Sequence, residues 1–341
     1  MQSTNRAESY PPMGLTWNHL LCYHRIMNKK QIAGHDLVPG TSLRGQIHVD
    51  GTSINVPYQI ITGVRPEPTL LLTAGIHSAE YVGVEALIAL SSELSPETLC
   101  GTVIIVPLAN PSGFEHRTMS LVYEDGKNLN RVFPGDPEGT AADRLAYALF
   151  QHLIRHADAY VDLHSGDGYE ELVPYVYYLG ETGTEEKARA MADCVCVEYA
   201  VRSSCRTGGA YNLASLSGIP SLLLERGQLS LRPQDQVDAD KADVINIMKH
   251  LGMLDGESAM FEKALLRETE LFSPATGCWY PAFHAGDSFR EGDLLGVIRN
   301  YYGDELHRII AASDGIILHQ CASLNILQDG PMISYGVPGE W

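Results

Sequence analysis

Residues 69–80, TLLLTAGIHSAE, decide how this chain of 341 residues folds. The run Thr69–Ala74 is largely apolar without polar alternation, which is typical of a β-strand covered on both faces. His77 and Glu80 follow at a spacing that places an imidazole and a carboxylate on one side of a turn or a first helical turn. Both side chains can therefore point at one divalent metal ion. In the alternative, His77 binds the backbone and Glu80 only favours the start of a helix.

From about residue 40 to residue 255, similar runs alternate with segments that carry apolar residues at helical spacing, which indicates an α/β fold. Residues 43–61 precede the first buried run and predict a β-hairpin whose turn is Asp50-Gly51. The strand-like runs are residues 69–74, 102–107, 159–163, 175–179, 195–201 and 221–224. The helical segments are residues 81–94, 143–156, 185–193 and 239–251.

After residue 255 the pattern changes, because Gly, Pro and Asp separate short strand-like pieces at 277–280, 294–298 and 315–318. This is typical of a small all-β domain. The sequence therefore predicts three parts, namely an N-terminal arm over 1–39, the α/β domain over 40–255 and a small β domain over 256–341.

The composition excludes several classes of partner. The chain has 24 Lys and Arg against 42 Asp and Glu, a formal charge of −18, which repels nucleic acid and anionic membranes. Its seven cysteines are scattered without a CxxC motif, so neither a disulfide framework nor a zinc ribbon is expected. The N-terminus lacks an apolar signal core, and no segment has membrane-spanning length. We therefore expect a cytoplasmic protein without nucleic-acid or membrane partners.

A third metal ligand is offered by YVDLHSGD, residues 160–167, where His164 stands at the end of another apolar strand. Open α/β sheets gather their sites at the carboxyl ends of strands. His77, Glu80 and His164 would form a set of two histidines and one glutamate with a fourth position open, as in catalytic zinc sites. Asp162 lies two residues earlier and is a candidate to orient a ligand imidazole, or a plain turn acid.

Two further motifs supply candidate chemistry. Glu225 ends the run in PSLLLERG, residues 220–227, where partial burial would raise its pKa and suit it to general acid–base work. Its alternative role is an ion pair with Arg226. Asn130 and Arg131, in NLNRVFPG, residues 128–135, offer an amide donor beside a planar fork that binds two carboxylate oxygens.

These motifs, in this order, resemble the succinylglutamate desuccinylase/aspartoacylase family within the zinc carboxypeptidase group. GIHSAE resembles its HxxE metal motif, NLNRVFPG its substrate-carboxylate motif, DLHSG its second-histidine motif and PSLLLERG its catalytic glutamate. The resemblance implies a carboxypeptidase-like mixed sheet flanked by helices, one Zn²⁺ per chain and amide hydrolysis. It also implies a C-terminal β domain similar to a barrel-sandwich hybrid.

The chain departs from the family pattern at two places. Ser78 and Ala79 stand between the first two ligands where Gly-Asp or Gly-Asn is frequent, but these positions are not ligands. Met119 stands where family members often carry an arginine that steadies the carbonyl oxyanion. Arg117, two residues away, is the candidate to replace that arginine from a shifted loop.

The functional hypothesis is zinc-dependent hydrolysis of an amide bond in a small N-acyl amino acid, with Glu225 moving the proton and Arg131 holding a carboxylate. A metallocarboxypeptidase acting on short peptides needs the same groups and is the first alternative. The second is a non-enzymatic metal- or ligand-binding protein on the same fold. A homo-oligomer is possible through an exposed edge of the small β domain.

Overall fold

The computed structural model describes residues 31–339. The chain divides into two compact units, Met1–Leu37 and Val38–Trp341. In the first unit, β1 (Gln31–Ile32) pairs antiparallel with β2 (His35–Asp36). Residues 1–30 of the expected N-terminal arm lie outside the described residues.

The second unit contains a 13-stranded mixed sheet, which confirms the α/β class. The strands pair in the order β14-β17-β19-β12-β10-β9-β11-β7-β5-β6-β4-β3, and β8 pairs with β17. The strands of the first half are β3 (Thr41–His48), β4 (Asn55–Thr62), β5 (Thr69–Ala74), β6 (Thr102–Val106), β7 (Ala159–His164), β8 (Glu170–Leu172), β9 (Tyr175–Leu179), β10 (Tyr199–Ser203) and β11 (Ser221–Glu225). Within this sheet, β6, β5, β7 and β11 run parallel, whereas β9 is antiparallel to β11.

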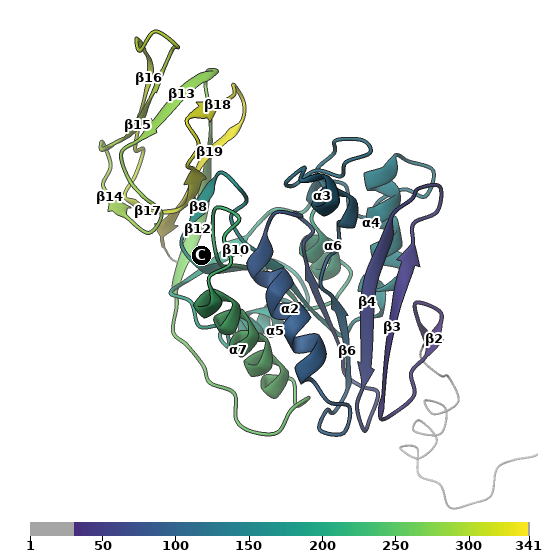
Figure 1. Ribbon diagram of the computed structural model, residues 1–341. Coiled ribbons are helices and arrows are strands. Elements are labelled where there is room, and N and C mark those ends of the chain that lie inside the picture. Colours follow the sequence, from purple (N-terminus) through teal and green to yellow (C-terminus); the bar gives the residue numbers. More distant parts are fainter. Residues whose placement is uncertain (1–30, 340–341) are drawn as a thin grey trace, which may run out of the picture. The chain divides into compact units, whose positions relative to one another are not determined.

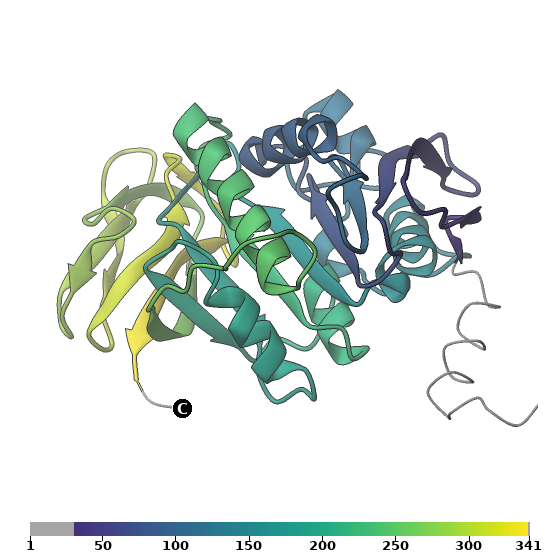
Figure 2. The same cartoon turned by 90° about the horizontal axis from the view of Figure 1, so that it is seen from below.

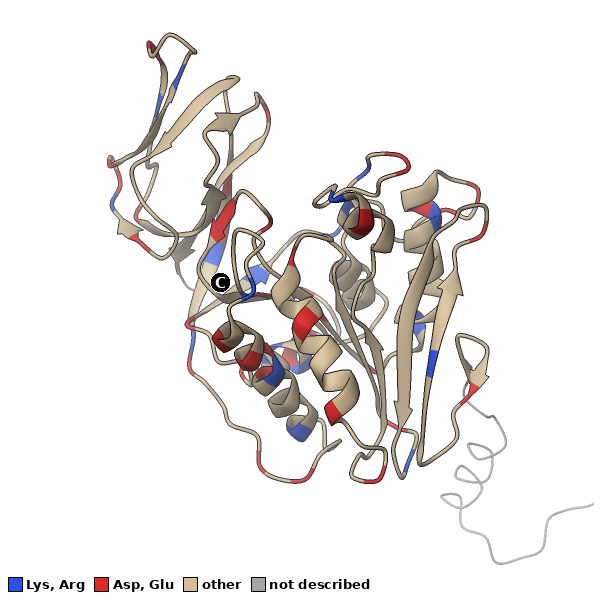
Figure 3. Cartoon of the chain, viewed as in Figure 1, with Lys and Arg blue, Asp and Glu red and all other residues tan. Residues whose placement is uncertain are grey.

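Helices cover both faces of the sheet, and α2 and α7 lie in front of it in Figure 1 while α4 and α6 lie behind. The helices are α2 (Tyr81–Glu93), α3 (Pro111–His116), α4 (Ala141–His152), α5 (Glu185–Ala192), α6 (Ala210–Leu216) and α7 (Gln234–His250), with short 3₁₀ turns η1 (Leu129–Arg131) and η2 (Ile154–His156). None of the helices within residues 31–339 has the length and apolar character needed to cross a bilayer. Acidic positions are spread over helices, strands and loops (Figure 3).

The main core lies between one face of the sheet and helices α2, α5 and α7. Leu70 and Leu72 of β5 point into it and are fully buried, as are Leu87 of α2 and Ile247 of α7. Each such side chain contributes roughly 1.5–3 kcal/mol when it is removed from water. This packing fixes the position of β5, whose carboxyl end carries the first sequence motif.

Gly83 sets how closely α2 approaches the sheet. A Cβ at this position would lie 2.6 Å from the Cβ of Leu163 in β7. Only a residue without a side chain fits that distance. The first turn of α2 therefore packs directly against the end of β7.

The C-terminal residues are all-β, as predicted, and Figure 2 shows them from below. The strands are β12 (Ala264–Phe272), β13 (Gly277–Pro281), β14 (Ser288–Phe289), β15 (Leu294–Arg299), β16 (Glu305–Ile310), β17 (Gly315–Cys321), β18 (Asn325–Ile326) and β19 (Pro331–Pro338). A four-stranded sheet has the order β16-β15-β13-β18. Trp279 of β13 is buried in a separate hydrophobic core that the C-terminal strands form. Strand β12 pairs in parallel with β10, so the large sheet continues across residue 255. The predicted boundary at 255/256 between an α/β domain and a small β domain stays a prediction.

Candidate metal centre and its cavity

His77 and Glu80 lie between the end of β5 and the start of α2. The chain turns sharply at Gly75, whose φ of 64° is readily adopted only by glycine. Glu80 is the residue before the first turn of α2. The Nδ1 atom of His77 lies 2.7 Å from Oε1 of Glu80, so the two side chains face each other as the sequence predicts.

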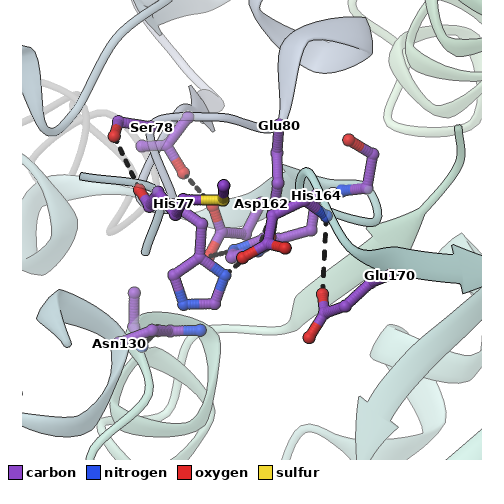
Figure 4. A network of polar contacts seen from close by, with 12 residues as sticks. His77, Ser78, Glu80, Asn130, Asp162, His164 and Glu170 are labelled. Atoms are coloured by element: carbon purple, nitrogen blue, oxygen red, sulfur yellow. Dashed lines mark hydrogen bonds and ion pairs between the residues drawn. The ribbon is translucent and has the colours of Figure 1, made fainter. Parts of the chain in front are cut away.

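His164 is the last residue of β7, which runs parallel to β5 as its neighbour. Its Nδ1 atom lies 2.8 Å from the other oxygen of Glu80, Oε2. Figure 4 shows the two imidazoles pointing toward the Glu80 carboxylate from different elements. The three residues each offer a ligand atom, and these atoms all lie within 4.8 Å of one another.

This donor set fits a single small cation. Two imidazoles and one carboxylate are ligands of catalytic zinc sites, with each donor about 2 Å from the ion. In both histidines it is Nδ1 that faces Glu80, so the donors converge on one point. Glu80 and His164 are almost completely buried, whereas the His77 side chain is 15% exposed.

A second layer of oxygen atoms lies behind the two histidines. Oδ2 of Asp162 lies 3.1 Å from Nε2 of His164, so Asp162 stays a candidate to orient this imidazole. Oδ1 of Asn128 lies 3.1 Å from Nε2 of His77. Asn128 belongs to the NLNR motif but is not among the site residues predicted from the sequence. Its contact with His77 joins two loops that are far apart in the chain, so no local pattern reveals it.

The charged groups in this cluster shift one another's pKa values. Burial raises the pKa of Glu80, but the positive charges of His77 and His164 outweigh this effect and lower that pKa to about 2. Burial lowers the pKa of His164, but the negative charges of Asp162 and Glu80 more than compensate and hold that pKa well above its ordinary value.

Glu225 is the last residue of β11 and is paired in register with His164 of β7. Burial raises the pKa of Glu225 well above its ordinary value, and the negative charge of Glu80 adds to this effect. The alternative ion pair with Arg226 does not form. Instead, the Arg226 guanidinium lies 3.1 Å from Asp240 and 2.7 Å from Asp243, both in α7.

Asn130 and Arg131 lie in the 3₁₀ turn η1. Asn130 is buried, and its side-chain oxygen accepts a hydrogen bond of 2.9 Å from the backbone N–H of Ala210. Arg131 is exposed and lines the same cavity as the metal-ligand candidates. Gly208 permits this arrangement, because a Cβ there would lie 2.7 Å from the backbone oxygen of Arg131.

A cavity of about 430 Å³ joins these groups. The predicted residues that line it are His77, Glu80, Asn130, Arg131, His164 and Glu225. Arg117 is not among its lining residues. It is exposed and caps the end of α3 in a left-handed conformation with a φ of 58°, which turns the chain after the helix. The structure therefore does not bring Arg117 to the other predicted residues.

One wall of the cavity is acidic and comes from the C-terminal strand β12 and from β8. Glu268 and Glu270 of β12 line it, together with Glu170 of β8. The Glu268 carboxylate accepts hydrogen bonds from the hydroxyls of Tyr177 and Ser334. Among the described lining residues, Arg131 is the only lysine or arginine. The sequence does not reveal this wall, because the pairing of β12 with β10 is a long-range contact.

The chain is similar in sequence to a known enzyme family. Residues 66–251 match the succinylglutamate desuccinylase/aspartoacylase catalytic domain. The N-alpha-acetyl-L-2,4-diaminobutyric acid deacetylase of Halomonas elongata is 30% identical over 224 residues, which span 64% of this chain and 64% of that protein.

Solved structures share the architecture over nearly the whole chain. The product-bound ectoine utilization protein EutE (DoeB) of Ruegeria pomeroyi has a TM-score of 0.80 at 26% identity, covering 89% of this chain and 97% of that one. A succinylglutamate desuccinylase/aspartoacylase of Rhodobacter sphaeroides has a TM-score of 0.80 at 22% identity, covering 90% and 98%. At that identity the second likeness concerns the fold alone.

Proposed function

Because the chain belongs to the succinylglutamate desuccinylase/aspartoacylase family, we propose that it hydrolyses the amide bond of a small N-acyl amino acid with the help of one bound Zn²⁺. The observation that carries this proposal is the convergence of His77, Glu80 and His164 in a cavity that Glu225 also lines. A metal site beside a buried acid is an arrangement that can activate water and hydrolyse an amide bond.

We assign the metal ligands to His77, Glu80 and His164. Two imidazoles and one carboxylate favour zinc over harder cations such as magnesium, which prefer oxygen ligands alone. When bound, zinc supplies Lewis acidity, which polarises a substrate carbonyl and lowers the pKa of water. Asp162 and Asn128 hold the far sides of the two imidazoles.

Glu225 is the proposed general base and acid. It lies beside His164 at the carboxyl end of β11, and burial raises its pKa, which makes it a stronger base than an exposed glutamate. It accepts the proton of the attacking water and delivers it to the departing amine. Arg226 is held by Asp240 and Asp243 of α7 and does not pair with this carboxylate.

Arg131 is proposed to bind the carboxylate of the substrate with its planar fork, and Asn130 to fix the turn that presents it. The acidic wall favours a substrate that also carries a positive charge, because Glu268 and Glu270 would attract an ammonium group and repel a second carboxylate. An N-acylated diamino acid satisfies both requirements. The substrate in the name of the Halomonas elongata relative is a compound of this kind.

The proposed enzyme is distinguished from its alternatives by a substrate panel. Purified protein is loaded with zinc and offered N-acetyl diamino acids, N-acetyl and N-succinyl acidic amino acids, and dipeptides with varied C-terminal residues. We expect release of acetate from the N-acetyl diamino acids and abolition of activity by a chelator. Preferential cleavage of dipeptides would instead support a carboxypeptidase, and zinc binding without any hydrolysis would support a ligand-binding protein.

The cytoplasm remains the proposed location, since all cysteines described in the structure are free thiols.

A further inference from the structure

Arg226 directly follows Glu225 in the chain, yet the two side chains lie in different surroundings. Glu225 ends β11 and lines the cavity, whereas Arg226 is buried against α7. Successive side chains of an extended chain point to opposite faces. The direction of the Glu225 side chain is therefore tied to that of its neighbour.

The guanidinium of Arg226 has three anchors. Nη1 lies 3.1 Å from Asp240 and Nη2 lies 2.7 Å from Asp243, both in α7. Nη2 also donates a hydrogen bond of 3.0 Å to the backbone oxygen of Cys196. Asp243 in turn accepts the backbone N–H of Cys196 at 2.8 Å. Because a planar guanidinium binds in a fixed geometry, this side chain cannot turn without leaving a buried charge unpaired.

The backbone around Arg226 is joined to the segment that carries His164. The N–H of Arg226 donates to the backbone oxygen of His164 at 3.0 Å. The N–H of Gly166 donates to the backbone oxygen of Gly227, also at 3.0 Å. A shift of Arg226 relative to α7 would therefore move the end of β11 relative to the metal-ligand candidate beside it.

The charges of α7 keep Arg226 away from Glu225. Asp240 and Asp243 are both buried, so two carboxyl groups on the helix face one guanidinium. A need for stability does not account for this group, because apolar side chains of similar volume can often replace a buried ion group without loss of stability. The arrangement does, however, give the end of β11 one fixed position.

We propose that Arg226 is a positioning residue, which directs the Glu225 carboxylate into the cavity by fixing the end of β11 to α7. This proposal rests on the proton-transfer role that the proposed function gives to Glu225. It extends that role to the contacts that place the carboxylate. A reacting group displaced by about 1 Å can lose about 100-fold in rate.

Two variants remove the anchor in different ways. R226M/D240L/D243N removes all three charges and keeps an acceptor for the backbone N–H of Cys196. R226K keeps the positive charge but replaces the planar guanidinium by a single ammonium group. Circular dichroism and thermal melting establish which variants are folded.

The matched control is R202M/E185Q. Arg202 of β10 binds Glu185 of α5 at 2.6 and 3.1 Å, so this pair also joins a strand to a helix. Neither residue is among those that line the cavity. The control therefore removes an ion pair of the same kind without touching the end of β11.

The kinetic measurement uses the substrate of the panel that the parent hydrolyses fastest. We expect the folded triple variant to lose about 10- to 100-fold in kcat, with KM and zinc affinity unchanged. R226K should have a reduced kcat and a parental KM, and the control should match the parent. Since Glu225 is present in every variant, a loss confined to kcat reports its placement.

Hydrogen–deuterium exchange supplies a readout that does not depend on activity. Peptides covering residues 221–230 should lose protection in the triple variant and in R226K, but not in the control. Parental protection or a parental kcat in the folded triple variant overturns the proposal, as does a rise in KM alone or an equal loss of kcat in the control. If the triple variant does not fold, R226K decides by the same two measurements.

Failure of the proposed function gives a different result. A parent protein that hydrolyses no substrate overturns the proposed function. The exchange comparison still decides whether Arg226 holds the end of β11 in place.

Discussion

His77 follows strand β5 and His164 ends strand β7, yet their ring centroids lie 4.9 Å apart with the planes at 87° to each other. The edge-to-face arrangement leaves both Nδ1 atoms directed at Glu80. It arises because β5 and β7 are parallel neighbours whose carboxyl ends stop at the same edge of the sheet.

Removal of one of these imidazoles should abolish metal binding. We expect His164→Ala to lose stoichiometric zinc, since two remaining protein ligands bind a zinc ion weakly. Elemental analysis of protein dialysed against zinc-containing buffer measures this. His307→Ala, at an exposed position, is the control and should keep its zinc. A full equivalent of zinc in the His164 variant would show that the ion sits elsewhere.

Glu225→Gln should separate metal binding from proton transfer. The amide fills the same volume but cannot accept the proton of water, so we expect a loss on the order of 10³-fold or more in kcat with zinc content unchanged. Steady-state rates of acetate release give the comparison. Hydrolysis at the parental rate would remove Glu225 from the proposed mechanism.

Arg131→Ala should chiefly raise KM for substrates that carry a free carboxylate. The effect should shrink for a substrate whose carboxylate is replaced by a neutral amide, because the guanidinium then has no anion to bind. Arg117→Ala is the matched control, since Arg117 is exposed and lies outside the cavity lining. An equal rise in KM for both substrates would contradict the carboxylate assignment.

Glu268→Gln should weaken the preference for a cationic substrate. The variant keeps the hydrogen-bond acceptor for Tyr177 and Ser334 but loses the negative charge. We expect kcat/KM to fall for an N-acetyl diamino acid and to stay nearly constant for its neutral isostere of the same length. Parallel kinetics with the two substrates measure the ratio. Equal losses would mean that Glu268 acts through packing instead.

The buried group around Arg226 should make stability depend on pH. Burial raises the pKa of Asp240 to about 8, even though Arg226 partly opposes this. Between the unfolded pKa of about 4 and this value, the native state holds a proton that the unfolded state has released, so stability should decrease as the pH rises.

The decrease is at most about 1.4 kcal/mol per pH unit for one group. Urea unfolding from pH 4.5 to 8.5 should therefore show a shallower decline for Asp240→Asn than for the parent. Identical pH profiles would indicate that Asp240 is ionised throughout, as a full partner of Arg226.

The sequence predicts most of the sheet and the metal-ligand candidates because these depend on local patterns. The buried run Thr69–Ala74 coincides with β5, and the run 175–179 with β9. In contrast, β10 begins at Tyr199, later than the predicted start at 195, because Val195 and Val197 are buried in the core without belonging to a strand.

What the sequence does not predict depends on contacts between distant segments. Asn128 reaches His77 across two loops, and Glu268 reaches the cavity only because β12 joins the sheet beside β10. Arg117 is the opposite case. Its position near a motif suggests a catalytic role, but a left-handed residue at the end of α3 places it outside the cavity lining.

Gly83 bears no functional group, yet its lack of a side chain sets the geometry of the metal centre. Adding one methyl at Gly83 would drive it into Leu163, whose next neighbour along β7 is His164. Relief would require α2 and β7 to separate, and Glu80 and His164 would separate with them. Gly83→Ala should therefore weaken zinc binding, although every proposed metal ligand and the proposed proton-transfer residue are still present.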